Sequence, residues 1–468
     1  MTTAALVGVG GIDNSLINNG VISTIDDGSE GIISFDQENT SIVNTGEIVT
    51  AGVNSDGVSV VRALGNVSVL NIGTIQTSGS GAQGVDVDVF SDGAPIAGSM
   101  VGVVNEGSIT ATDAIGVSLF GEAITLMNSG SIESSLTSVV LSDASNTIFD
   151  NSGTIIGGLD GVEINADMLS PGSTIQIINS GTIQAAETAL RTQFGAVNLD
   201  NSGEIVGNVS IDFAEDFLNT GSIQGDVALG VNADTFRNFG AITGNVVTGD
   251  GNDFFISSGA ITGSVDLGAG NDAALIGVGQ SSVTGGINAG AGDDFASVLG
   301  NVAEGEEAVV DALVNFEQLS LQINGAVRFA DAVAFNAVNV VGGTDVTINN
   351  TDFSADVISV EMDAALTFGE TSSVSLGAFT GIELATSSSF TNQGLITASN
   401  EAILGQGDGI SVQNTGTLTV NGAGVAVIGS NATITNMGNI IVASNLGSDS
   451  GFSADALSII GGENNSIT

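Results

Sequence analysis

The chain has 468 residues, with 52 acidic residues against four arginines, no lysine and no histidine, and a formal net charge of −48. Nucleic acids and anionic membrane surfaces repel such a polyanion, so both are poor partners and no nucleic-acid partner is expected. The hydrophobic fraction of 42% excludes the disorder that so high a charge alone would indicate.

Small and β-branched apolar residues, 68 glycines and only two prolines indicate many tight turns. Residues 309–321 come closest to a helical period, and no such stretch persists, so the chain is predicted to be all-β. The absence of cysteine excludes disulfides, thiolate metal sites and cysteine nucleophiles. No stretch approaches the about 20 apolar residues of a membrane span, so we expect no direct membrane insertion.

A motif Asn-x-Gly-x-Ile/Leu recurs along the chain. Its asparagines are Asn44, Asn71, Asn105, Asn128, Asn151, Asn179, Asn201, Asn219, Asn238, Asn392, Asn414 and Asn436. Near matches begin at Asn18 ("NNGVI") and Ser257 ("SSGAI"). A fixed internal repeat of this length is typical of solenoid proteins.

Within residues 201–261 the apolar residues keep their distance from each repeat start. The positions four and eight residues later are occupied by Ile205, Ile223, Ile242 and Ile261, and by Val209, Val227, Val246 and Val265. Apolar residues at even offsets form short strands with one buried face, and stacked coils bury that face. The sequence therefore predicts a right-handed parallel β-helix (β-solenoid), a single elongated rod of roughly 20 coils with strands about 4.8 Å apart.

The repeated asparagine and glycine are interpreted as turn chemistry and not as an active site. A stacked asparagine can hydrogen-bond to its copies in the coils above and below. The glycine suits a corner that requires a positive φ.

Four regions follow one another along the predicted rod. Residues 1–200 have long irregular coils, and residues 201–300 have tight coils of 18–22 residues with an acidic corner. Residues 301–391 lose the motif but keep strand periodicity, and residues 392–468 regain it and end in mid-repeat.

An aspartate stands fifteen residues after each start of the tight repeats. These aspartates are Asp216, Asp234, Asp253 and Asp272, and Asp294 continues the column after a three-residue insertion. Carboxylates stacked about 5 Å apart repel each other by roughly 1–3 kcal/mol per pair. Solvent exposure, raised pKa values or a bound cation would relieve this repulsion.

The last three coils of the block carry Gly-x-Gly-x-Asp, at residues 249–254, 268–273 and 290–295. Carboxylate, amide and backbone oxygens are the hard ligands that Ca²⁺ prefers, with carbonyls expected from residues 249–251 and 268–270. The candidate side-chain ligands are Asp250, Asn252, Asp253, Asn271, Asp272, Asp293 and Asp294. A solvated corner without an ion is the alternative, and the sequence leaves both open.

The Gly-x-Gly-x-Asp block resembles the calcium-binding nonapeptide of RTX proteins. It departs from that nonapeptide at Thr248, Leu267 and Ala289, which replace the first glycine, and it has one motif per coil instead of two. Together with the Asn-x-Gly-x-Ile repeats and "LVNFEQLSL" at 313–321, the chain resembles the repeat-rich passenger domains of autotransporter proteins. That resemblance implies an extracellular β-helix displayed on the cell surface of a Gram-negative bacterium.

The two ends of the sequence match each other. "GGENNSIT" at 461–468 aligns with "GGIDNSLI" at 10–17, which leads into the first repeat. We expect either a segment of a longer protein or an end that stacks on the beginning of another copy. The N-terminus lacks the basic start of a signal peptide, so either a signal was removed or export uses another route.

The favoured function is a secreted or surface-displayed structural or adhesive protein without catalysis. Its partners would be a surface glycan or protein receptor, gripped for example by the long coil at 76–104, or copies of itself in a filament or surface layer. The alternative is an enzyme acting on polysaccharides through paired carboxylates. The acidic pairs at 213–217 and 85–90 are explained as well by a corner and an alternating strand, and the lack of histidine excludes a Ser–His arrangement.

Overall fold

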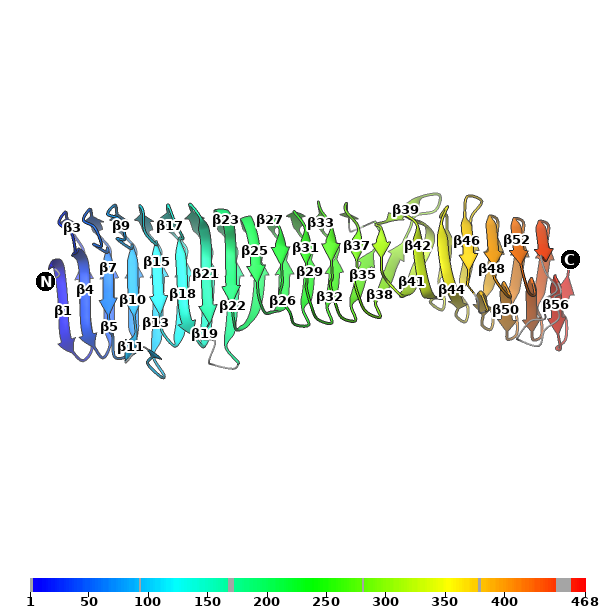
Figure 1. Ribbon diagram of the computed structural model, residues 1–468, viewed down its shortest axis with the longest axis horizontal. Coiled ribbons are helices and arrows are strands. Elements are labelled where there is room, and N and C mark those ends of the chain that lie inside the picture. Colours follow the sequence, from blue (N-terminus) through cyan, green and yellow to red (C-terminus); the bar gives the residue numbers. More distant parts are fainter. Residues whose placement is uncertain (1–2, 92–93, 167–171, 280–281, 378–379, 443–455) are drawn as a thin grey trace. The chain divides into compact units, whose positions relative to one another are not determined.

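The computed structural model describes residues 3–91, 94–166, 172–279, 282–377, 380–442 and 456–468 (Figure 1). These residues form an all-β parallel β-solenoid of about 19 turns, and none of them is helical. The predicted fold class is confirmed, while its right-handed sense stays a prediction. The segment nearest to a helical period forms strands β39 (Glu307–Val310), β40 (Leu313–Val314) and the start of β41 (Gln318–Phe329).

The chain divides into two compact units, Met1–Gly249 and Asp250–Thr468. The boundary lies inside the tight acidic block, and the four-region division of the sequence stays a prediction.

Three columns of parallel strands build the first unit, and each coil contributes one strand, or one part of a long strand, to each column (Figure 1). Strands of the first column end on the repeat asparagine: β2 (Asn14–Asn18), β5 (Thr40–Asn44), β8 (Val67–Asn71), β13 (Met100–Asn105), β16 (Ala123–Asn128), β19 (Asn146–Asn151), β22 (Thr174–Asn179), β24 (Ala196–Asn201), β26 (Ala214–Asn219) and β29 (Thr235–Asn238).

The second column carries the isoleucine of the motif. It comprises β3 (Val21–Thr24), β6 (Glu47–Thr50), β9 (Thr74–Thr77), β14 (Ser108–Ala111), β17 (Ser131–Ser134), β20 (Thr154–Gly157), β23 (Thr182–Gln193), β25 (Glu204–Ile211), β27 (Ser222–Gln224) and β30 (Ala241–Thr243). The third column completes each coil. It comprises β1 (Thr3–Gly11), β4 (Ser29–Gln37), β7 (Val58–Val61), β10 (Val85–Asp88), β15 (Val117–Phe120), β18 (Val139–Ala144), β21 (Asp160–Ala166), the later parts of β23 and β25, β28 (Val227–Ala228) and β31 (Val246–Val247). A short antiparallel hairpin, β11 (Phe90–Ser91) and β12 (Ala94–Pro95), projects from one turn.

The second unit begins with the coils of the acidic corner. Their short strands are β33 (Ala260–Ile261), β34 (Val265–Asp266), β36 (Ser282–Val283) and β37 (Ile287–Asn288). A column descends from Ser257 through β32 (Phe254–Ser257), β35 (Ala273–Gly277), β38 (Phe295–Asn301), the first part of β41, the later parts of β42 (Val333–Val340) and β44 (Phe353–Val360), β47 (Ile382–Leu384), β50 (Ile403–Gln406), β53 (Val425–Ile428) and β56 (Leu457–Ile460).

The motif that returns at Asn392 lies on a different column. That column comprises β39, the later part of β41, β43 (Asp345–Ile348), β45 (Ala365–Phe368), β48 (Ser389–Asn392), β51 (Ser411–Asn414), β54 (Thr433–Asn436) and β57 (Ser466–Ile467). The third column comprises the first parts of β42 and β44, β46 (Ser373–Leu376), β49 (Leu395–Ala398), β52 (Thr417–Val420) and β55 (Asn439–Val442). Between Ser257 and Asn392 the repeat has therefore moved from one column to another.

The core consists of aliphatic columns inside the coils. The four motif isoleucines of the tight repeats and the valines four residues after them are all at most 1% exposed, as predicted. In the first unit Ile205 pairs with Ile223, and Ile223 pairs with Ile242, in parallel register. Each buried Ile or Val contributes about 1.5–3 kcal/mol, so stacking is the main source of stability.

Candidate functional site

The repeat asparagines form a continuous side-chain ladder in the first unit. Each Nδ2 donates a hydrogen bond to Oδ1 of the asparagine one coil further along, over nine steps from Asn18 to Asn238 at 2.7–2.8 Å. A shorter ladder of the same kind joins Asn392, Asn414 and Asn436 in the second unit. The predicted asparagine stacking is confirmed.

The backbone at each ladder position is also engaged. The carbonyl oxygen of Asn128 accepts from the N–H groups of Ser152 and Gly153 in the next coil, at 2.8 and 3.0 Å. At the start of each ladder, where no earlier asparagine donates, Oδ1 accepts from a glycine N–H two residues on: Gly20 for Asn18 and Gly394 for Asn392, both at 3.1 Å. Both faces of the amide are therefore used for structure.

The explanation predicted for the motif glycine is wrong. Gly46, Gly73 and the equivalent glycines do not have positive φ. A Cβ at Gly153 would instead lie 2.1 Å from the carbonyl oxygen of Gly130, the same position one coil earlier. The glycines are required because neighbouring backbones approach too closely for any side chain.

The acidic corner separates the candidate ligands into two columns. Asp253, Asp272 and Asp294 are buried, with 2%, 1% and 0% exposure. The N–H of Asp253 donates to Oδ1 of Asp272 at 2.8 Å, and the N–H of Asp272 donates to Oδ1 of Asp294 at 2.7 Å. The half-buried Glu317 accepts from the N–H of Asp294 at 2.8 Å and continues this column beyond the predicted motif.

The other candidates are exposed. Asn252 Oδ1 accepts from the N–H of Asn271 at 2.7 Å, and Asn271 Oδ1 accepts from the N–H of Asp293 at 3.0 Å. Asp250 is exposed as well, and its backbone bridges to Ala269. The structure thus brings the seven residues to one corner but places them on a buried and an exposed side of the chain.

Two predicted features of the corner need correction or extension. Asp216 is not stacked on Asp234, because it lies in register with Thr235 and pairs with Arg237, whose Nε is 3.1 Å from Asp216 Oδ1. Glycines of this corner do have positive φ, for example 102° at Gly268 and 98° at Gly290.

Burial governs the charge of the inner column. Burial, together with the nearby Asp253 and Asp294 carboxylates, raises the pKa of Asp272 to about 6, and the hydrogen bond from the N–H of Asp253 opposes this rise. Burial also raises the pKa of Asp294, assisted by Glu317 and Asp293. Both Asp272 Oδ2 and Asp294 Oδ2 are buried without a hydrogen-bond partner among the described residues.

The fit of this corner to a cation is mixed. The carbonyl oxygens of Gly268 and Ala269, expected as calcium ligands, already accept backbone N–H groups at 2.9 and 2.7 Å. Each retains a second lone pair. Over the described ranges, no group of three or more acidic side chains is arranged to hold a metal ion. The buried Oδ2 atoms of Asp272 and Asp294 are the part of the corner that could bind a cation or a proton.

Residues 301–391 are held together differently. Phe329, Phe353, Phe368 and Phe390 form a chain of ring contacts with centroids 5.8–6.1 Å apart. Phe368 occupies the ladder position, in register with Ile348 before it and Asn392 after it. At the ladder position, apolar side chains therefore stand in place of the amides in these coils.

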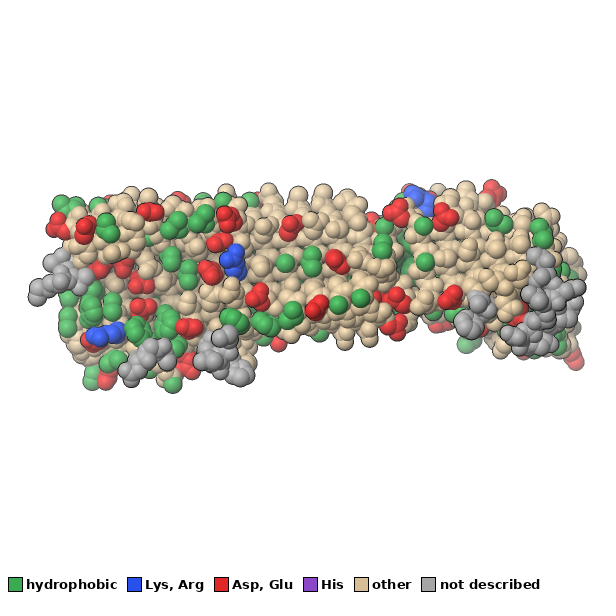
Figure 2. Space-filling model, in the orientation of Figure 1, with side chains coloured by type: hydrophobic (Ala, Val, Ile, Leu, Met, Phe, Trp, Pro, Cys, Tyr) green, Lys and Arg blue, Asp and Glu red, His purple; other side chains and the backbone are tan. Residues whose placement is uncertain are grey.

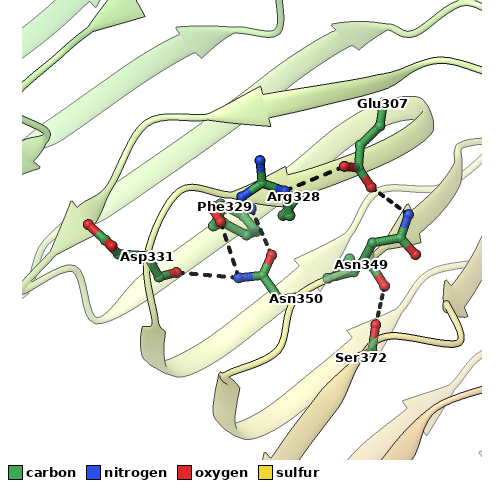
Figure 3. A network of polar contacts seen from close by, with 8 residues as sticks. Glu307, Arg328, Phe329, Asp331, Asn349, Asn350 and Ser372 are labelled. Carbon is green, nitrogen blue, oxygen red and sulfur yellow. Dashed lines mark hydrogen bonds and ion pairs between the residues drawn. The ribbon is translucent and has the colours of Figure 1, made fainter.

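Polar contacts beside these rings are isolated bridges and not ladders (Figure 3). Asn350 Oδ1 accepts from the N–H of Phe329 at 2.7 Å, one coil earlier. Glu307 accepts from Nδ2 of Asn349 at 2.7 Å and lies 3.5 Å from Nε of Arg328 (Figure 3).

The sequence did not predict a second set of neighbouring carboxyl side chains, which lies in the first unit. Glu30, Asp56, Asp86 and Asp88 come from three successive coils of the first unit, and the face shown in Figure 2 has acidic side chains gathered over β4, β7 and β10. The sequence contained one signal, the "VDVDVF" alternation at 85–90, but the spacing to Glu30 and Asp56 depends on coil lengths that only the structure supplies.

Comparison with family models, with curated proteins and with solved structures finds no match to this chain. The structure assigns it to the class of parallel β-solenoids with stacked asparagine ladders. The described part of the chain also holds no helix that is long and apolar enough to cross a membrane.

Proposed function

We propose that the chain is a secreted or surface-displayed structural or adhesive β-solenoid without catalysis. The observation that carries this proposal is that the most often repeated polar side chains bond to neighbouring coils. The side chains of the ladder asparagines and corner aspartates form hydrogen bonds with neighbouring coils, as Asn151 does with Asn128 and Asn179. Residues that recur for coil-to-coil bonding support a scaffold role.

The resemblance of the repeats to autotransporter passenger domains supports an extracellular location at a Gram-negative cell surface. On this proposal the partner is a surface glycan or a protein receptor. The near absence of positive charge favours neutral glycans or basic protein surfaces over acidic polymers.

The test is a binding and turnover screen with the purified chain. Immobilised neutral and acidic glycans are tested for retention of the protein, and the same polysaccharides are assayed in solution for new reducing ends. We expect no turnover. Hydrolysis that is lost in Asp86→Asn or Asp216→Asn would instead establish the enzyme alternative, and filaments or sheets in electron micrographs would favour a self-assembling subunit.

We also propose that the acidic corner binds Ca²⁺, supported by the buried Oδ2 atoms of Asp272 and Asp294. Ca²⁺ should raise the melting temperature relative to EGTA, because binding to the folded state alone stabilises by about 2.7 kcal/mol at a hundredfold excess over Kd. Asp272→Asn with Asp294→Asn should remove the shift, whereas the exposed Asp200→Asn should keep it. An unchanged melt in millimolar Ca²⁺ would leave a protonated or hydrated corner.

A further inference from the structure

The four carboxyl side chains of Glu30, Asp56, Asp86 and Asp88 are here called the carboxyl cluster. They come from three consecutive coils of the first unit. In parallel register, Asp86 lies between Ser59 of β7 and Ser118 of β15. Glu30 and Asp56 occupy equivalent positions just ahead of the pairs that join β4 and β7. Glu30 and Asp56 therefore lie in register on coils about 4.8 Å apart, and Asp86 lies three positions further along the next coil.

Hydrogen bonds tie this carboxyl cluster to the backbone of the coils. The Glu30 carboxylate accepts from the N–H of Asp56, and Asp56 Oδ1 accepts from the N–H of Gln83 at 2.7 Å. Glu30 is only 5% exposed, and the other three members are partly buried. These contacts hold Glu30 and Asp56 in place, so that they cannot turn away from their neighbours.

No base compensates the carboxyl cluster within the described residues. The chain has no lysine or histidine, and Arg62, the first arginine, pairs with Asp36 at 2.8 Å on the exposed surface. The negative charges of Asp88 and Asp56 act on Asp86, and those of Glu30 and Asp88 act on Asp56, and each raises the pKa of the carboxyl on which it acts. Full ionisation would place several unpaired negative charges in a partly dry environment, which is strongly unfavourable.

A separate feature points to a proton donor at this place. Gln83 follows Glu30 and Asp56 in the same position of the next coil, and its Oε1 atom is buried without a donor among the described residues. An ionised carboxylate can only accept hydrogen bonds, whereas a protonated carboxyl can donate one.

We propose that the carboxyl cluster is a proton-dependent clamp, which joins β4, β7 and β10 when it holds protons and loosens them when it is ionised. Burial together with the neighbouring carboxylates raises the pKa of Asp86 to about 8 and that of Asp56 to about 7. Burial also raises the pKa of Glu30 to about 7 and that of Asp88 above its usual value.

The sign of the effect follows from these directions. In the unfolded chain the same carboxyls lose their protons near pH 4, so between about pH 4 and 8 the folded form binds more protons than the unfolded form. Stability is therefore highest on the acidic side of this window and falls as the pH rises through 7 and 8. Each unit of pKa shift corresponds to about a tenfold change in the local opening equilibrium.

The test is hydrogen exchange of the full chain, followed by mass spectrometry of peptides from β4, β7 and β10. After correction for the intrinsic pH dependence of exchange, protection of these strands should fall at least about tenfold from pH 5.5 to pH 8.5. Strands β22 and β24, which lie elsewhere in the first unit, are the internal reference. Unchanged protection of β4, β7 and β10 across this range would overturn the proposal.

Two variants make the test specific. Asp56→Asn with Asp86→Asn should flatten the pH dependence and raise protection at pH 8.5, while the exposed Asp200→Asn should behave as the parent chain. A double variant that keeps the full pH dependence would contradict the clamp. Restoration of protection at pH 8.5 by millimolar Ca²⁺ would also contradict it, because the group would then be a cation site; if the variant does not fold, the parent chain's own pH profile decides.

Discussion

A ladder asparagine is an acceptor for one coil and a donor for the next. Asn151 accepts from Asn128 and donates to Asn179, both at 2.8 Å, while it is fully buried. An aspartate or a leucine of similar size could not supply both functions, since Asp cannot donate when ionised and Leu can do neither. The side-chain amide is thus the group that lets each coil hydrogen-bond to both of its neighbours.

Replacing Asn151 with alanine should lower the free energy of unfolding by about 2–4 kcal/mol, because a buried donor and a buried acceptor lose their partners. Urea denaturation followed by circular dichroism measures this. The exposed Asn198→Ala, two strands further along the same column, is the matched control and should change stability by less than about 0.5 kcal/mol. Equal effects of the two substitutions would show that the ladder adds nothing.

Gly153→Ala should be at least as destabilising, because its Cβ would lie 2.1 Å from the Gly130 carbonyl and force two coils apart. Gly20 has the same place in the motif, yet a Cβ there would meet none of the described atoms within 4 Å. Thermal melts of Gly153→Ala and Gly20→Ala should therefore differ widely. A similar, small loss in both would point to chain entropy and not to close packing.

The strand is the scale at which the two kinds of coil differ. In the second unit the ladder position is occupied by Ile348, then Phe368, then Asn392 in consecutive coils. An apolar column and an amide column meet there, and the glycine N–H bond to Asn392 Oδ1 closes the amide side. Apolar columns and amide columns both stack, provided that each apolar or amide side chain contacts a side chain of the same type in at least one adjacent coil.

Phe368→Asn tests this requirement, since it adds one asparagine to the ladder position but buries an amide against Ile348. We expect a loss of about 3–5 kcal/mol, dominated by the missing ring contacts with Phe353 and Phe390. Phe368→Leu, which keeps the column apolar, should cost clearly less. Unfolding in urea compares the two, and a Phe368→Asn variant as stable as the parent chain would refute the rule.

At the scale of the whole molecule, charge opposes folding. A formal charge of −48 with four arginines leaves most carboxylates without an ionic partner. Three ion pairs are found among the described residues: Arg62 with Asp36, Arg237 with Asp216, and Arg328 with Glu307. Screening by salt is therefore the main means of reducing the repulsion.

The melting temperature should rise when NaCl is increased from about 10 to 150 mM, as the Debye length falls from about 30 to 8 Å. The measurement is made in EGTA, so that specific binding of divalent ions does not contribute. Substitution of NaCl by KCl should give the same curve. A melting temperature that is independent of salt would mean that the carboxylates are already neutralised by protons.

Much of the fold was determined by the sequence alone. The even spacing of isoleucine and valine after each asparagine predicted inward columns, and Ile205, Ile223 and Ile242 form one. The recurrence of asparagine predicted stacking, and the ladder confirms it. The first signal lies within a single coil and the second is a recurrence along the chain, so neither requires knowledge of the contacts between coils.

Tertiary structure alone decided how unequal coils align. Between Ser257 and Asn392 the motif changes from one strand column to another. The side chains of Asp253, Asp272 and Asp294 are buried. The motif glycine is required because neighbouring backbones approach each other closely. Tertiary structure also brought Glu30, Asp56 and Asp86 together across turns of different length. The physical reason is that register between coils is set by packing and hydrogen bonds across about 5 Å of space, between residues 18 to 34 positions apart.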